Sequence, residues 1–405
     1  MKVFATAAWF KHLGSPFARM IFAATIAGAC TFLNVYCTQP LLPFFQRLFH
    51  ASEVEVSLTV GAVTLSVALM APLIGLAAET LGRKKIIVLA LFAMGIVSLL
   101  TATSNDLHGM IFWRFAQGLF VPGVIAVIMA FINEEFPAHA GIVMSAYVTG
   151  TVFGGFLGRF LTGLIAVRWD WRVAFIVLGV LDLFGALAVR QWLPSAVHFV
   201  SAKSFSQSLG DIRDHVRNPK LMAVCCMGFT VLFSLVGVFT YVSFYLAKSP
   251  FNLSPAALGS LFFVYLAGCV VTPLAGRFLD RHGFHRTALL SVSMSVSGLL
   301  FTLIPWLPVV IVGLAVFSSG IFVSQAAASV LTGRVAEHAR SAAAGLYVTF
   351  YYIGGSVSSV ATAWFWLHGG WSACVALFAT VSLATLLFSG VSGRSLAAPG
   401  RVDAE

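Results

Sequence analysis

Long apolar runs follow one another along almost the whole of this 405-residue chain, and they constrain its fold more than any other feature. Hydrophobic residues make up 59% of the sequence and charged residues only 9%, whereas a soluble domain carries about 25% charged residues. An apolar helix of about 20 residues is long enough to cross the hydrocarbon core of a bilayer. The sequence therefore predicts an all-α membrane protein.

The apolar runs predict twelve transmembrane helices with mostly short connections. The spans are expected at residues 17–45, 56–78, 86–104, 109–133, 141–166, 172–193, 220–247, 256–279, 287–305, 307–333, 342–367 and 371–392. The first run is too long for the apolar core of a cleavable signal peptide, so we interpret it as a span. The one long polar connection, 194–219, divides the chain into an N-terminal six-helix bundle (1–193) and a C-terminal six-helix bundle with a short tail (220–405).

The Lys and Arg residues predict the orientation of these spans. Of the 24 such residues, eighteen lie at the termini or in the loops of one side, and four lie on the other side. Arg114 and Arg159, the remaining two, fall inside spans. Because loops rich in Lys and Arg stay in the cytoplasm, we expect both termini and the 194–219 linker to be cytoplasmic.

One charged turn occurs twice, between spans two and three (residues 75–85) and between spans eight and nine (residues 276–286). Each copy has a glycine, an acid four residues later, a second glycine three residues after the acid, and bases. The candidate gating residues of the two loops are Gly75, Glu79, Gly82, Arg83, Gly276, Asp280, Arg281 and Gly283. Duplication at this scale indicates a transporter built from two similar, pseudo-symmetric bundles.

The span number, the division into halves and the duplicated loop together resemble the major facilitator superfamily. Residues 75–85 are similar to its signature loop, with Glu79 for the usual Asp and Thr80 for Arg, whereas the second copy keeps Asp280 and Arg281. The resemblance implies a secondary transporter of the bacterial inner membrane that works by alternating access. It also implies that the loop glycines let helices pack closely, and that the acid meets a helix end to hold one conformation.

Two further motifs are similar to the drug:H+ antiporter-1 branch, whose members export drugs and sugars. Asn34 precedes a Pro-x-x-Pro segment (40–43), as in the first-helix motif of that branch, with Asn34 where Gly is commoner. Arg114 and Gln117 match its Arg-x-x-Gln-Gly motif, which is linked with proton coupling. The resemblance implies proton-coupled efflux of a small organic compound.

A stripe of glycines in span five approximates the antiporter motif of the same branch, with Arg159 in place of the last Gly. Gly150, Gly154 and Gly158 recur every four residues, and small residues at this spacing let helices approach closely in lipid. We therefore expect span five to pack tightly against a neighbour. A role in the direction of exchange is implied only by the resemblance.

Three ionisable residues, Arg114, Arg159 and Asp182, lie well inside spans and form the candidate charge network. Charge is costly there and marks either function or a structural pair. Asp182 and Arg159 lie at similar depths, so the favoured interpretation is a fixed ion pair, and the alternative is that Asp182 binds and releases a proton. Arg114 either shares a functional face with Gln117 one turn along or extends towards the outer interface.

The candidate cargo surface comes from polar and aromatic residues of spans one, four, seven, ten and eleven. Its members are Asn34, Tyr36, Gln39, Gln117, Tyr241, Gln325, Tyr347 and Tyr351. A cavity with aromatics, amides and few fixed charges suits a drug-like, amphipathic or neutral compound. Any one of these tyrosines is equally consistent with an interfacial aromatic belt.

Several other functions lack their sequence signatures. There is no Walker A motif, and the six cysteines lie in apolar runs without C-x-x-C spacing, so we expect no ATP hydrolysis, cofactor or metal. The basic residues are spread over alternate loops and do not form one basic face or tail, so we expect no nucleic-acid partner. The expected partners are a small-molecule substrate, protons and membrane lipid, and we expect a monomer.

The leading hypothesis is proton-coupled efflux of a small organic compound. One alternative is a metabolite or sugar carrier of the same fold without proton antiport. An alternative of another class is a polytopic enzyme or sensor, which would need convergent catalytic groups that the sequence does not show.

Overall fold

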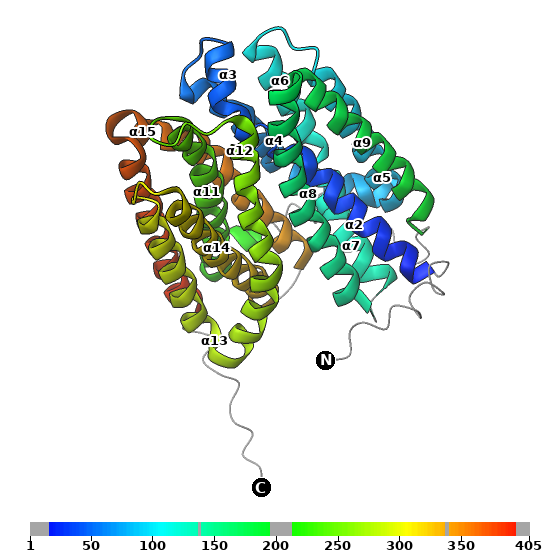
Figure 1. Cartoon of the computed structure of the whole chain (residues 1–405). Coiled ribbons are helices and arrows are strands. Elements are labelled where there is room, and N and C mark those ends of the chain that lie inside the picture. The colour runs from blue at the N-terminus through cyan, green and yellow to red at the C-terminus, as the bar shows by residue number, and fades with distance from the viewer. Residues whose placement is uncertain (1–15, 137–138, 195–212, 337–339, 394–405) are drawn as a thin grey trace, which may run out of the picture.

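The computed structural model describes residues 16–136, 139–194, 213–336 and 340–393, and within these ranges every regular element is helical. This confirms the prediction of an all-α protein. The linker predicted at 194–219 lies mostly outside the described residues. Figure 1 shows the early helices gathered on one side of the molecule and the later helices on the other.

The first group contains nine helical elements, and α2 and α8 form its largest contact. Their bounds are α2 Pro16–Val35, η1 Gln39–Leu41, α3 Leu42–Leu48, α4 Glu53–Leu81, α5 Arg83–Thr101, α6 Leu107–Phe120, α7 Pro122–Glu135, α8 Ala140–Arg168 and α9 Trp171–Trp192. We call this group the N half. Around the α2–α8 pair, α4 packs on α6, and α9 packs on both α5 and α2.

The second group, the C half, is organised as two helix pairs: α11 packs mainly against α15, and α13 mainly against α14. The bounds are α11 Pro219–Ala247, α12 Pro255–Ser260, η3 Leu261–Tyr265, α13 Leu266–Phe301, α14 Leu307–Val335 and α15 Arg340–Gly393. The described chain starts at α2 and ends at α15 near the same end of the molecule (Figure 1).

Glycines interrupt the two longest helices of the C half. Gly283 in α13 has φ 77° and Gly370 in α15 has φ 60°, so each of these elements is two helices joined across a kink. Ten helices among the described residues are long and apolar enough to cross a membrane. That number counts α15 once and leaves out the part of α13 after its kink, so twelve spans stays a prediction.

Side-chain caps set where several helices begin. The Ser52 hydroxyl accepts from the Glu55 backbone nitrogen, and the Glu55 carboxylate accepts from the Ser52 backbone nitrogen. These two bonds form a capping box at the N-terminus of α4. Asp170 caps α9 and Asn218 caps α11 through their side-chain oxygens. These caps satisfy backbone N–H groups in the first turns of the three helices.

Candidate functional site

The break at the end of α2 is the feature around which the candidate site is built. α2 ends at Val35, a turn follows, and Pro40 then lies within η1. A broken helix leaves carbonyl groups without intrahelical donors, and in a membrane each must find another partner. Thr162 of α8 donates to the carbonyl of Cys37 at 2.7 Å, and a guanidinium serves the carbonyl at the helix end.

That guanidinium belongs to Arg114, whose side chain is fully buried. Its Nη2 donates to the Val35 carbonyl at 2.6 Å and its Nε to the Thr59 carbonyl of α4 at 3.2 Å. Arg114 also donates to the amide oxygen of Gln117, as expected for neighbours one turn apart. The guanidinium therefore points into the N half and does not extend towards the outer interface. It caps the negative end of the α2 dipole.

Gln117 faces the same interior rather than the C half. Its side chain is fully buried, and its Nε2 donates to the Met94 carbonyl of α5 at 3.4 Å. The structure thus places Gln117 beside Arg114, within the N half, and away from the other candidate cargo residues of the C half.

Asp182 lies on α9, fully buried, and it pairs with an amide rather than with a cation. Its Oδ2 accepts a hydrogen bond from Asn34 Nδ2 at 2.5 Å, and its Oδ1 has no hydrogen-bond partner. Ser98 of α5 donates to Asn34 Oδ1 at 3.0 Å and so fixes the orientation of the amide. Cys30 lies beside the same carboxyl.

The expectation of an Asp182–Arg159 ion pair is therefore wrong. Each residue has a different partner: Asp182 binds Asn34 of α2, and Arg159 binds Gln39 of η1. Depth along a helix does not fix which way its side chain points. Asp182 takes part in none of the ion pairs formed within the described ranges.

Arg159 instead lies where the two halves meet. Its side chain is 2% exposed, its Nε donates to Gln39 Oε1 at 2.8 Å, and it also donates to the Gly155 carbonyl. The guanidinium carbon lies 4.8 Å from the ring centre of Tyr36 in the N half. In the C half it lies 4.4 Å from the ring centre of Phe262 and 5.1 Å from that of Tyr265. These are cation–π distances.

Several direct contacts join the halves in the same region. Gln39 Nε2 donates to Thr240 Oγ1 of α11 at 3.2 Å, so Gln39 touches both Arg159 and the C half. Tyr241 of α11 is fully buried, and its hydroxyl donates to the Ser359 carbonyl of α15 at 3.0 Å, a bond within the C half. Lys248 pairs with Glu53 at 3.5 Å near the start of α4. The halves are therefore tied together at the end of the molecule where α4 begins.

Small residues bring the two backbones close in this contact. A Cβ atom at Gly61 would lie 2.3 Å from Ser359 Oγ, and one at Gly163 would lie 2.3 Å from the Pro255 carbonyl oxygen. A Cβ at Gly259 would lie 2.6 Å from the Arg159 carbonyl oxygen. The contact is therefore tightly packed, and at Gly163 and Gly259 the backbone of one half lies directly against the backbone of the other.

An aromatic cluster continues from Arg159 into the C half. Tyr351 and Tyr352 of α15 both lie near Tyr36 of the N half. Tyr351 packs against Tyr347 at 6.1 Å between ring centres and is hydrogen-bonded to Gln325 of α14. Tyr36, Gln39 and Tyr351 therefore lie at the contact between the halves. Gln325 and Tyr347 contact Tyr351 from within the C half, and Tyr241 bonds Ser359 within the C half. Asn34 and Gln117 lie inside the N half.

The glycine stripe of α8 packs as predicted. Added Cβ atoms at Gly150, Gly154 and Gly158 would lie 2.1, 2.0 and 1.8 Å from the carbonyl oxygens of Thr25, Ala29 and Leu33, respectively. Both series advance by four residues, so α8 and α2 run in contact along one stripe. This confirms the expected close packing, and it brings Arg159 to the break in α2.

The duplicated loops show a different reason for their glycines from the one expected. Gly82 has φ 88° and Gly283 has φ 77°, values that side chains rarely adopt. A Cβ at Gly82, Gly276 or Gly283 would meet nothing within 4 Å, so these positions do not serve close helix packing. The expectation of close packing is wrong for them, and a turn geometry explains Gly82 and Gly283.

The bases of the first loop bind the ends of other helices. Arg83 forms an ion pair with Glu134 near the end of α7, and Lys84 donates to the Leu193 carbonyl at the end of α9. Both are favourable positions for a cation. In the second loop Arg281 is exposed. The surroundings of Gly75 and the side chains of Glu79 and Asp280 lie outside the described part of the structure.

Sequence reasoning missed the residues that complete these contacts. Phe262, Tyr265 and Thr240 approach Arg159 and Gln39 from the other half, and no linear spacing could reveal contacts across the halves. Ser98 was missed because a lone serine in an apolar run carries no signal. Within the described ranges, no group of three or more His, Cys, Asp or Glu side chains could hold a metal ion.

Known protein sequences match this chain over most of its length. The family model described as Major Facilitator Superfamily matches residues 24–358 and 246–399. The uncharacterized MFS-type transporter YybF of Bacillus subtilis is 32% identical over 391 residues, covering 96% of this chain and 97% of YybF. The inner membrane transport protein YnfM of Escherichia coli is 32% identical over 381 residues, covering 93% of this chain and 91% of YnfM.

Solved structures share the fold at low sequence identity. The nucleoside transporter NupG superposes with a TM-score of 0.75 at 11% identity, covering 92% of this chain and 99% of that one. A bacterial homologue of the human lysosomal transporter Spinster, in an inward-facing and unoccupied conformation, gives a TM-score of 0.70 at 14% identity and covers 94% and 96% of the two chains.

Proposed function

Because the chain belongs to the major facilitator superfamily, we propose that it is a secondary active transporter that exports a small organic compound in exchange for protons. The family is one of transporters, not enzymes, and the relatives are bacterial transporters, so the alternative of a polytopic enzyme or sensor is set aside. The proposed cargo is drug-like, amphipathic or neutral, since the residues at the contact between the halves are mainly aromatic and amide groups.

Alternating access is supported by where the halves touch. Gln39 and Arg159 contact the C half, and Lys248 of the C half pairs with Glu53, at the end of the molecule where α4 begins. We assign this end to the outside, because the charge distribution of the loops puts the termini in the cytoplasm. The described conformation is then closed outside, and the outward-open state requires these contacts to separate.

Proton coupling rests on one observation, the pairing of the buried Asp182 carboxyl with the Asn34 amide, with no cation partner among the residues that the structure describes. Burying an ionised carboxylate without a cation is costly. A group in this position is therefore suited to carry a proton in one conformation and to release it in another. With a fixed Asp182–Arg159 pair excluded, this is the role that the geometry favours.

A chain of contacts connects Asp182, the proposed proton carrier, to the contact between the halves. Asn34, which holds Asp182, directly precedes Val35, whose carbonyl accepts from Arg114. The next residues along the chain include Tyr36 and Gln39, both in contact with Arg159. A change in the Asp182–Asn34 bond would therefore act on the break in α2, which touches the C half.

The test begins with finding the cargo. A susceptibility and metabolite screen on a deletion strain and an overexpressing strain should identify a compound whose export depends on the protein. Purified protein in proteoliposomes should then move that compound against its gradient when a pH gradient is imposed. We expect collapse of the pH gradient to abolish this accumulation.

The same assay separates the proposal from its main alternative. A metabolite or sugar carrier without proton antiport would give downhill flux that collapse of the pH gradient leaves unchanged. Such a result would reject proton exchange and retain a transporter.

A further inference from the structure

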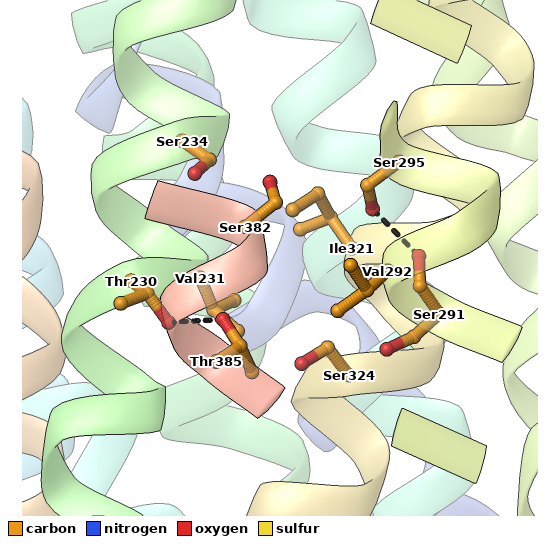
Figure 2. A pocket seen from close by; sticks show the side chains of 10 residues that line it. All are labelled: Thr230, Val231, Ser234, Ser291, Val292, Ser295, Ile321, Ser324, Ser382 and Thr385. Carbon is orange, nitrogen blue, oxygen red and sulfur yellow. Dashed lines mark hydrogen bonds between the residues drawn. The ribbon is translucent and has the colours of Figure 1, made fainter. Parts of the chain in front are cut away.

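A hydroxyl-lined cavity lies inside the C half, between its two helix pairs, and its lining includes neither Arg159 nor Asp182. Figure 2 shows its lining side chains coming from α11, α13, α14 and α15. The space open to the centre of a water molecule is about 10 Å³, which is about the room that one water requires. Seven of the lining residues are Ser or Thr, and the rest are aliphatic.

Three of these hydroxyls have no hydrogen-bond partner in the part of the chain that the structure describes: Ser234 on α11, Ser324 on α14 and Ser382 on α15. Their side chains are at least nine-tenths buried, with Ser324 the most exposed at 6%. A buried hydroxyl without a partner is unfavourable, and native proteins seldom leave one so. Three at one cavity indicate a missing common partner.

Neighbouring hydroxyls show that this is not a general feature of serines in these helices. Ser295 donates to the Ser291 carbonyl one turn back at 2.9 Å, and Thr230 bonds Thr385 across the helix pair at 2.9 Å, as Figure 2 shows. Ser319, also on α14, donates to the Ala315 carbonyl at 2.7 Å. A serine in a helix can donate to the carbonyl one turn back, but Ser234, Ser324 and Ser382 do not form this bond.

We propose that this cavity is a binding site for ordered water, which bridges the α11–α15 pair to the α13–α14 pair. A neutral occupant fits because no charged side chain is among the described residues that line the cavity. Water both donates and accepts, so it satisfies hydroxyls from three helices at once. It also keeps these hydroxyls bonded when the two pairs shift against each other during the conformational cycle.

The test uses thermal unfolding of the purified full-length protein. Ser324→Ala and Ser382→Ala should each lower Tm by about 2 °C, because each variant removes a hydrogen bond to the bound water. The matched control is Ser319→Ala, which removes a buried hydroxyl of α14 that is already bonded to its own helix, and its Tm should stay within about 1 °C of wild type. An unchanged or higher Tm in both cavity variants would overturn the proposal, because removing a partnerless hydroxyl should not destabilise the protein.

Two further readouts exclude other occupants. Wild-type Tm should be equal in sodium chloride and choline chloride at the same concentration; a higher value in sodium that is lost in Ser324→Ala would indicate a cation site and overturn the proposal. A high-resolution experimental map should show a density peak within hydrogen-bond distance of Ser324 or Ser382, and an empty cavity would also overturn it.

Discussion

Asn34 donates a hydrogen bond of 2.5 Å to the carboxyl of Asp182, and this bond replaces the salt bridge that helix depth suggested. The carboxyl is fully buried, its second oxygen has no hydrogen-bond partner, and the amide is itself oriented by Ser98. An uncharged partner leaves the protonation of Asp182 free to change. The proposed coupling depends on this arrangement.

Asp182→Asn should therefore leave a folded protein that no longer couples transport to protons. The new amide can still accept from Asn34, so Tm should stay close to wild type, while uphill transport driven by a pH gradient should fall at least tenfold, that is, by more than about 1.4 kcal/mol of coupling free energy. Proteoliposome flux measured with and without the gradient checks this, since downhill exchange should persist. Gradient-driven accumulation at the wild-type level would remove Asp182 from the coupling step.

Arg114→Ala should destabilise the protein rather than act on coupling alone. The variant leaves the Val35 and Thr59 carbonyls without their donor in a buried site, and hydrogen bonds to charged groups contribute about 1.5–3 kcal/mol each. We expect a lower Tm and a lower yield of monodisperse protein, with Arg114→Lys retaining part of both. Size-exclusion chromatography and thermal unfolding measure these changes. Wild-type stability with lost transport would instead assign Arg114 a direct role in coupling.

Arg159→Met should open the outer end of the molecule more often. The methionine retains much of the packing volume but loses the bond to Gln39 and the contacts with Phe262 and Tyr265. In a background where Cys37 is the only cysteine, its alkylation from outside should become at least threefold faster, a shift of about 0.7 kcal/mol in the open population. Arg168→Met, an exposed position at the end of the same helix, is the control and should leave the rate unchanged.

Gly158→Ala should disrupt the α2–α8 contact. The added Cβ would lie 1.8 Å from the Leu33 carbonyl oxygen, and overpacking of this kind costs about 1–3 kcal/mol or more. Expression level and Tm measure the effect. Gly141→Ala, on the same helix but with nothing within 4 Å, is the control; equal stability of the two variants would show that the stripe tolerates side chains.

The helices and the stripe were predictable because they depend on local pattern. Apolar length gives a spanning helix, glycines four residues apart give a close contact, and Arg114 with Gln117 share a face whatever lies around them. The partners of Asp182 and Arg159 were not predictable. Position along a predicted span indicates how deep a side chain lies but not how its helix is rotated, and Asp182 and Arg159 bind Asn34 and Gln39 instead of each other.

Contacts between the halves were also beyond the sequence. Gln39 was expected at a cargo surface, but its partners Thr240 and Arg159 come from α11 and α8. The loop glycines were noticed for their repetition, yet their physical reason, a positive φ at Gly82 and Gly283, depends on a backbone conformation that the resemblance did not supply.

Alternating access by the two halves is tested most directly by distances at both ends of the molecule in liposomes. Spin labels at Leu48→Cys and Ser372→Cys report on the outer end, and labels at Lys85→Cys and His285→Cys report on the cytoplasmic end, each pair joining the two halves. Electron-spin distance measurements on wild type and Arg159→Met should show opposite changes: the variant gains longer outer distances and shorter cytoplasmic distances. Distances that stay fixed at both ends, or that lengthen together, would contradict the account.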